Sequence, residues 1–205
     1  MQIARHSPVL TQQLIRACTA NQTFKGKIKT QGNDLDPITY LYQLGVLSLS
    51  HLGIDYSPGK EVDLAVPNIS VRHDYAEAFL DYHTNSTGGT MSAFVNNPTA
   101  DTLFDCCKQM IQNVKSGFWT NSRTETDIAC FLAADLYVNS EADVGMEHHP
   151  GEDTKLKIDI KALTDENFVT MEAKFIKARA KNLDLSQSLR TVEVCVMWKL
   201  VSECV

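Results

Sequence analysis

Apolar residues recur at three- and four-residue spacing over the first part of the chain, which is the spacing of amphipathic helices. A short strand is expected at 60–68, where Pro67 stops it. Turn-forming residues gather in 84–100, which is therefore expected to be a loop between two parts of the chain. The helical pattern covers residues 8–20, 37–48, 69–83, 101–118 and 124–139.

The apolar period changes to two in the last part of the chain, as is typical of half-buried strands. Residues 155–163 (KLKIDIKAL) and 167–175 (NFVTMEAKF) both alternate strictly between apolar and polar positions. The connection between them contains turn-forming residues, which predicts a hairpin with Asp165-Glu166 as a two-residue loop. The final stretch, 191–205, is expected to form another strand.

Composition places the chain among ordinary globular proteins. Its 205 residues are 43% hydrophobic and 21% charged, which allows one sizeable domain or a medium domain with a small one. The net charge of −6 excludes a basic field over the whole protein, so nucleic-acid binding would need a local patch. No apolar run reaches membrane-spanning length, and the N-terminus is too polar for a signal peptide. We therefore expect an intracellular protein, cytoplasmic or nuclear, whose cysteines are reduced thiols.

Charged residues occupy the polar face of the expected hairpin. The two-residue loop would place Asp159 directly opposite Glu172 and Lys157 opposite Lys174. Cβ atoms of such neighbours lie about 5 Å apart, and like charges there are destabilising. A divalent cation held by both carboxylates would offset that repulsion, with lysines nearby to attract a phosphate. The alternative is a solvated stripe of charges, since half-exposed antiparallel sheets commonly have one polar face.

A further acid, Glu125, lies at the start of the helix expected at 124–139. It extends the apolar stripe of that helix, and from there it could reach a cation held by the sheet. It also fits a capping motif, because Ser122 precedes it by three residues, and acids in a first turn are favoured by the helix dipole. Helix chemistry alone favours capping, and the two roles are compatible.

These residues carry a resemblance to a known family. An acid on a helix (Glu125), then an Asp (Asp159), then Glu-x-Lys (EAK, 172–174) resembles the pattern of the PD-(D/E)XK nuclease superfamily. In addition, YLYQLGVLSL (40–49) and VDLAVPNISVRHDYAEAFLDY (62–82) resemble the segment that links AAA-ATPase-like modules to a C-terminal domain of this superfamily. Related domains occur in Crinkler-type effectors, and the likeness spans about residues 38–176.

The resemblance implies an α/β fold with a restriction-endonuclease-like core, a central mixed sheet flanked by helices. That core would occupy residues 91–205, after a helical, winged-helix-like segment at 1–90. The resemblance implies Asp159, Glu172 and Glu125 as ligands of Mg²⁺ or Mn²⁺, and Lys174 as the residue that orients or activates water. The implied activity is hydrolysis of a phosphodiester in DNA or RNA.

Departures from the family pattern limit what can be carried over. No Walker A motif occurs, so this chain lacks the ATP site of the ATPase module. Relatives often carry Gln-x-x-x-Tyr after the Glu-x-Lys strand, whereas here Gln187 is followed by Thr191. A basic run after the motif would contact phosphates or form a solvated helix face; it comprises Lys177, Arg179 and Lys181. The segment 146–153 (MEHHPGED) lacks the ligand spacing of zinc sites, and it is expected to be a polar loop at the mouth of the site.

Two other functions remain open. A catalytically inactive domain of the nuclease fold would serve as an interaction or effector module with a protein partner, which the net negative charge favours. A nucleic-acid-binding module within residues 36–83 is the third interpretation, although that segment offers Lys60 and Arg72 as its basic residues.

Overall fold

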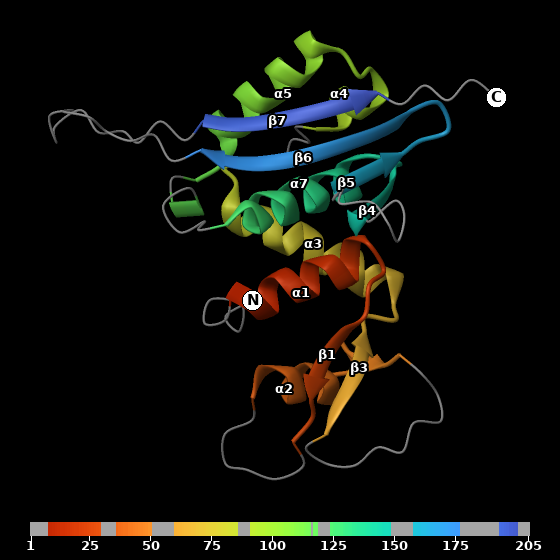
Figure 1. The fold of residues 1–205 in the computed structure, drawn as a ribbon. Coiled ribbons are helices and arrows are strands. Elements are labelled where there is room, and N and C mark those ends of the chain that lie inside the picture. Colours follow the sequence, from red (N-terminus) through yellow and green to blue (C-terminus); the bar gives the residue numbers. More distant parts are fainter. Residues whose placement is uncertain are drawn as a thin grey trace, which may run out of the picture.

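The fold is known from a computed structural model of the whole chain, in which long helices pack on a four-stranded sheet and a smaller sheet lies apart from it (Figure 1). The fold is therefore mixed α and β. The structure describes residues 8–29, 36–50, 60–85, 91–115, 117–118, 124–148, 158–176 and 193–200.

Helix α7 (Glu125–Asn139) lies at the centre of the larger core. Its side chains from Ile128 to Leu136 are all buried, because it is apolar on nearly every side and is surrounded by other elements. Its N-cap is Thr124, whose side chain and that of Asp127 form a reciprocal capping box. The helix therefore starts where the sequence predicted it.

The other long helices surround α7. Helices α1 (Pro8–Thr19) and α3 (Ile69–His83) both contact it, and α5 (Ala100–Asn113) contributes its apolar side to the same core. The Asn68 side chain accepts hydrogen bonds from the first backbone N–H groups of α3, which fixes the start of that helix. The predicted helix at 69–83 is thereby confirmed.

The larger sheet contains β4 (Asp143–His148), β5 (Ile158–Leu163), β6 (Phe168–Ile176) and β7 (Glu193–Leu200) in that spatial order. All of its ladders are antiparallel in the described part of the chain. The expectation of a mixed sheet is therefore wrong for these strands. Each strand pairs with its neighbour in sequence, and a parallel pair would need a crossover connection between such neighbours.

The β5–β6 hairpin has the register that the alternating sequence predicted. Ile160 pairs with Met171, and Leu163 pairs with Phe168 beside the turn. Thr164 N donates to Asn167 O at 2.9 Å, which closes Asp165-Glu166 as a two-residue loop. The predicted turn is confirmed, and so is the predicted pairing of Ile160–Leu163 with β6; one residue of slip would have moved every side chain to the other face. Lys157, which was predicted to lie opposite Lys174, is outside the described residues.

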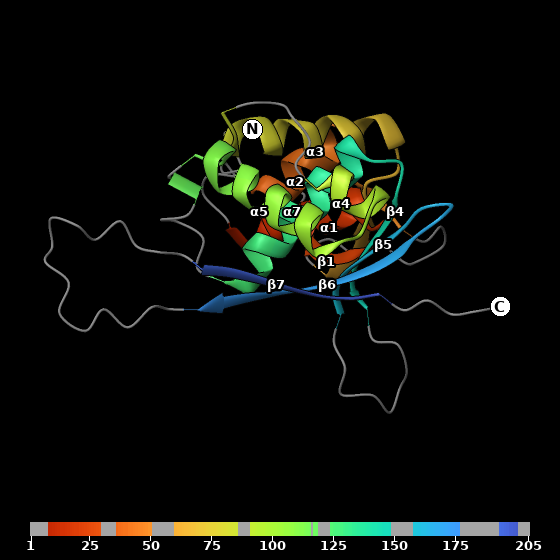
Figure 2. The same cartoon turned by 90° about the horizontal axis from the view of Figure 1, so that it is seen from above.

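One face of the larger sheet is covered by helices, and none of the described helices lies on the other (Figure 2). We call these the covered face and the open face. The covered face contacts α7 and belongs to the larger core. Its buried residues are Val144, Met146, Ile160, Ala162, Val169 and Met171. The alternate positions of β5 and β6, which lie on the open face, are half-buried or exposed; they are Asp159, Lys161, Leu163, Phe168, Thr170 and Glu172.

A second, smaller core lies under the three-stranded antiparallel sheet. This sheet contains β1 (Phe24–Lys27), β2 (Ser48–Leu49) and β3 (Glu61–Ala65) in the order β1-β3-β2, and α2 (Pro37–Gln43) contacts β1. The strand predicted at 60–68 is confirmed as β3. The buried residues of this core include Phe24, Leu41, Leu47, Val62 and Leu64.

The two cores meet along α1 and α3. Ile15 of α1 is buried in the larger core, whereas Leu14 of the same helix is buried in the smaller one. Gln12 Nε2 of α1 donates to Asp127 Oδ1 of α7 at 2.8 Å. Gln22 Nε2 donates to Met146 O of β4 at 2.6 Å. The first helix is therefore joined to both cores, and the domain boundary near residue 90 stays a prediction.

Several predicted elements differ from the structure. The helix predicted at 37–48 ends at Gln43, because Gly45 adopts φ 73° and the chain turns into β2. The segment predicted as a loop at 84–100 contains α4 (Ser92–Asn96), with Met91 and Phe94 fully buried. Helix α5 stops at Asn113 instead of residue 118, since Val114 is extended and bridges Thr84.

Residues 146–148 were expected to belong to a polar loop but form the end of β4. Val144 and Met146 point into the larger core at period two, which makes this segment a strand despite the polar residues that follow. The predicted final strand is confirmed over Glu193–Leu200 as β7, which pairs with β6.

Candidate functional site

Asp159 and Glu172 are the next positions beyond the Ile160–Met171 pair along β5 and β6. Both are half-buried and alternate with buried core residues, so they belong to the open face. Cβ atoms of adjacent residues on neighbouring antiparallel strands lie about 5 Å apart. Both residues also interact with other parts of the chain. The candidate site is therefore a pair of acids on adjacent strands of the β5–β6 hairpin.

Lys161 follows Asp159 on the open face and pairs with Gly145 of β4. Its aliphatic stem lies across the Gly145 backbone, because a Cβ added to that glycine would come within 2.9 Å of Lys161 Cδ. Because glycine has no Cβ, Gly145 leaves room for the Lys161 side chain. The ammonium group adds a positive charge to the face that carries the two acids.

Glu125 lies in a different layer. It is the first residue of α7, and α7 packs against the covered face, whereas Asp159 and Glu172 belong to the open face. Among the described residues, these three acids do not form a group whose ligand atoms lie within 4.8 Å of one another. Glu125 therefore lies in the helix layer, apart from the pair that Asp159 and Glu172 form on the sheet.

The predicted lysine and basic run are placed only in part. Lys174 is a β6 residue and pairs with Cys195 of β7, two positions beyond Glu172 on the same strand. Lys177, Arg179 and Lys181 lie outside the described residues. Their predicted contact with phosphate therefore stays a prediction.

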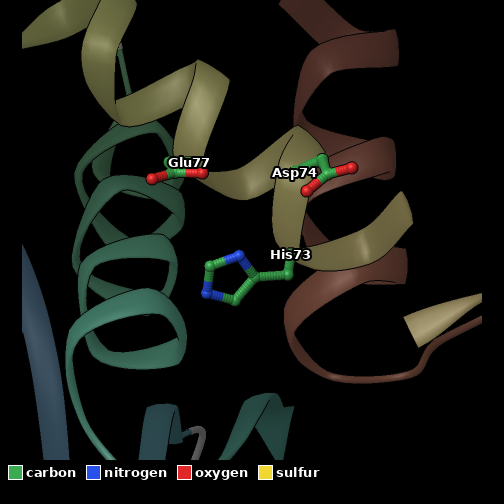
Figure 3. A group of neighbouring side chains, drawn as sticks. All are labelled: His73, Asp74 and Glu77. Atoms are coloured by element: carbon green, nitrogen blue, oxygen red, sulfur yellow. The ribbon is translucent and has the colours of Figure 1, made fainter. Parts of the chain in front are cut away.

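A different group of potential metal ligands lies on α3. Ligand atoms of His73, Asp74 and Glu77 lie within 4.8 Å of one another, and all three residues are exposed (Figure 3). His73 and Glu77 are one helical turn apart, which places them on one side of the helix. The His73 ring centroid lies 6.3 Å from that of Tyr137 on α7. Exposed groups of this kind are common on helix surfaces, so this group serves below as a control for metal binding.

Asp135 is a buried acid that the sequence patterns did not single out. Only 3% of its surface is exposed, in the middle of α7. Its Oδ2 accepts a hydrogen bond from Met91 N at 2.8 Å, and its Oδ1 accepts one from Asn139 Nδ2 at 3.1 Å. Asp135 therefore fixes the start of α4 against α7, a structural role. No periodicity could reveal it, because its partner is far away in sequence.

His83 is enclosed by aromatic rings at the end of α3. Its ring makes edge-to-face contacts with Phe79, Tyr82 and Phe118, at centroid distances of 4.7, 4.8 and 5.0 Å. Burial lowers the pKa of His83 to about 4, and the nearby Lys115 ammonium adds to the shift while Asp127 opposes it. His83 is therefore a neutral packing residue near pH 7.

The described cysteines fit their interpretation as small apolar residues. Cys18, Cys106, Cys107 and Cys130 form no disulfide bond. Burial raises the pKa of Cys18 to about 12, which leaves almost no thiolate near neutral pH. A nucleophilic role for this thiol is therefore unfavourable.

Comparison with known proteins gives no match to any family model, curated protein or solved structure. Within the described residues, no helix is both long and apolar enough to cross a membrane.

Proposed function

We propose that the chain is a metal-dependent nuclease-like protein in which Asp159 and Glu172 hold a divalent cation on the open face of the larger sheet. Lys174 would orient or activate the attacking water, and the target would be a phosphodiester of DNA or RNA. The one observation that carries the proposal is the register of the β5–β6 hairpin, because it sets the two acids at adjacent positions of paired strands.

The donor chemistry suits the proposed ion. Two carboxylates supply hard oxygen ligands, which Mg²⁺ and Mn²⁺ prefer, and Mg²⁺ usually keeps several waters when one or two carboxylates hold it. When bound, such an ion activates water and neutralises charge on a phosphoryl group. The protein's own contribution would be to hold the acids rigidly, with Lys161 beside them to attract the phosphate.

The element order also supports the proposed family. Helix α7 is followed by β4, β5 and β6, so an acidic helix start precedes a strand with Asp159 and a strand with Glu-x-Lys. The strand order β1-β3-β2, with α2 between β1 and β2, is compatible with the winged-helix-like segment proposed for residues 1–90.

Isothermal titration of Mn²⁺ tests the metal site. We expect heat of binding with the wild-type chain, and its loss in Asp159→Asn and in Glu172→Gln. Because His73, Asp74 and Glu77 form a rival group on α3, Glu77→Gln is the matched control and should keep the heat. A flat wild-type titration, or heat that is lost only in Glu77→Gln, would contradict the proposal.

Cleavage assays test the catalytic part separately. Labelled DNA and RNA should be cut in Mg²⁺ or Mn²⁺ and left intact in EDTA. Glu172→Gln should abolish cutting together with metal binding, whereas Lys174→Ala should abolish cutting and keep the Mn²⁺ heat. Full activity of Lys174→Ala would remove that lysine from the mechanism.

The second candidate is a protein with a nuclease-like fold that serves as an interaction module without catalysis. It is favoured by the position of Glu125 in the helix layer, apart from the two sheet acids. Under this alternative the Mn²⁺ titration is flat, no nucleic acid is cut, and Glu172→Gln has the same thermal stability with and without Mn²⁺.

A further inference from the structure

The open face continues from the two acids toward the hairpin turn. The next pair along the strands is Lys161 with Thr170, and the pair after that is Leu163 with Phe168. Leu163 is 49% exposed and Phe168 is 37% exposed, although both are large apolar residues. The open face therefore presents an apolar aromatic surface at its turn end.

The spacing along the strands sets how far apart these features lie. Residues on one face of a strand repeat about every 6.8 Å, so the Leu163–Phe168 pair lies about 14 Å from the two acids. Lys161 is the β5 residue midway between them, and its stem extends over Gly145 of β4. We call the surface formed by Asp159, Glu172, Lys161 and Phe168 the β5–β6 lane.

We propose that the β5–β6 lane binds a single strand of nucleic acid, with one base stacked on Phe168 and a phosphate near Lys161. This inference rests on the proposed function, because the strand would reach Asp159 and Glu172 at its other end. Exposed aromatic rings on a sheet bind unpaired bases through their π-faces, which a duplex keeps hidden in its stack. The ligand class is therefore single-stranded DNA or RNA.

The charges of the lane add a condition. Two carboxylates and one ammonium give the bare lane an excess of negative charge, which repels phosphate. Asp143 of β4, which pairs with Leu163, adds a further carboxylate beside the lane. A divalent cation held by Asp159 and Glu172 offsets this negative charge. Single-strand binding is therefore expected to strengthen when Mn²⁺ is present.

Fluorescence anisotropy with labelled dT12, rU12 and a 12-base-pair DNA duplex tests the lane. The Lys174→Ala chain is the parent, so that the oligonucleotides stay intact. In Mn²⁺ we expect tighter binding of at least one single strand than of the duplex, and a loss of roughly 5- to 100-fold in Phe168→Ala. Whether dT12 or rU12 binds more tightly identifies the sugar that the lane prefers.

Two variants control for indirect effects. Phe168→Tyr keeps a stacking ring and should bind within about twofold of the parent. Phe104→Ala removes an apolar ring that is 68% exposed on α5, which belongs to the helix layer and not to the open face, and should leave binding unchanged. Circular dichroism confirms that each variant is folded before its binding is compared.

The proposed single-strand binding is contradicted by any of three results. Phe168→Ala could bind as tightly as the parent, Phe104→Ala could weaken binding as much as Phe168→Ala does, or the duplex could bind as tightly as the single strands. Failure of the lane differs from failure of the metal site. If the heat of Mn²⁺ binding depends on Glu172 but oligonucleotide binding is unchanged in Phe168→Ala, only the proposed binding to the lane is rejected. If oligonucleotide binding is weakened in Phe168→Ala but Mn²⁺ gives no heat of binding, only the proposed metal site is rejected.

Discussion

The covered face and the open face of the larger sheet are formed by alternate residues of the same strands, yet their side chains differ in kind. Ile160 and Met171 on the covered face are buried against α7. Their neighbours Asp159 and Glu172 lie on the open face and are half-buried. The covered face fixes the fold through apolar burial, which leaves the open face free to carry charged and aromatic groups.

The largest expected difference between the faces comes from placing an acid on each. Met171→Asp buries a charge without a partner and should lower the free energy of unfolding by more than about 4 kcal/mol, or prevent folding. Thr170→Asp, one residue away on the open face, should change it by less than about 1 kcal/mol. Urea unfolding measures both, and equal effects would contradict the assignment of faces.

Removing an acid from α7 and one from the open face should give a smaller difference in the free energy of unfolding. Asp135→Ala leaves the buried Met91 N–H without its acceptor and should cost about 2–3 kcal/mol of unfolding free energy. Asp159→Ala on the open face should change the same quantity by less than about 1 kcal/mol in metal-free buffer. Thermal unfolding of both variants measures the difference. A larger cost for Asp159→Ala would mean that the open face is structural.

The stability of the fold should also depend on pH, because His83 in the helix layer has a lowered pKa. The pKa of His83 is about 4 in the folded chain and about 6.5 in the unfolded chain, so the unfolded chain binds more protons between these values. Stability should therefore be complete above pH 6.5 and fall toward pH 4, by about 1–2 kcal/mol for this partly exposed ring.

His83→Phe is the control for that dependence, because it keeps an aromatic ring among Phe79, Tyr82 and Phe118 and removes the titrating group. Urea midpoints at pH 7 and pH 4.5 should differ less in this variant than in the wild type. An identical pH dependence in both chains would assign the effect to other residues.

The smallest expected effect concerns Gly145 and Lys161. Gly145→Ala would place a Cβ against the Lys161 stem and should cost about 1 kcal/mol, because the lysine must move. In a Lys161→Ala background the same change should cost nothing measurable. A double-mutant cycle from thermal unfolding measures this coupling, and additive costs would contradict the packing of the lysine over the glycine.

Sequence periodicity was sufficient where one local pattern decides the structure. The β5–β6 hairpin follows from strict alternation with a two-residue turn, and α7 follows from its long apolar run after a capping box. Helix α3 was predictable for the same reason. In these elements the local preference and the tertiary packing agree.

Periodicity failed where tertiary contacts decide. The turn-rich stretch around α4 is buried because Phe94 and Val95 pack into the larger core and Asp135 holds its start. Strand β1 was missed, since its four residues alternate exposed lysines with Phe24 and Gly26. The antiparallel order of the sheet and the layer of Glu125 depend on how distant segments meet, which no local pattern specifies.

The most direct test of the central claim is to locate a bound Mn²⁺ ion by its paramagnetic broadening of amide signals in a ¹⁵N-labelled chain. Signals of the residues around Asp159 in β5 and around Glu172 in β6 should broaden first, and those of His73 to Glu77 on α3 should persist. Broadening that begins on α3, or that is absent from the β5–β6 hairpin, would contradict a cation site on the open face.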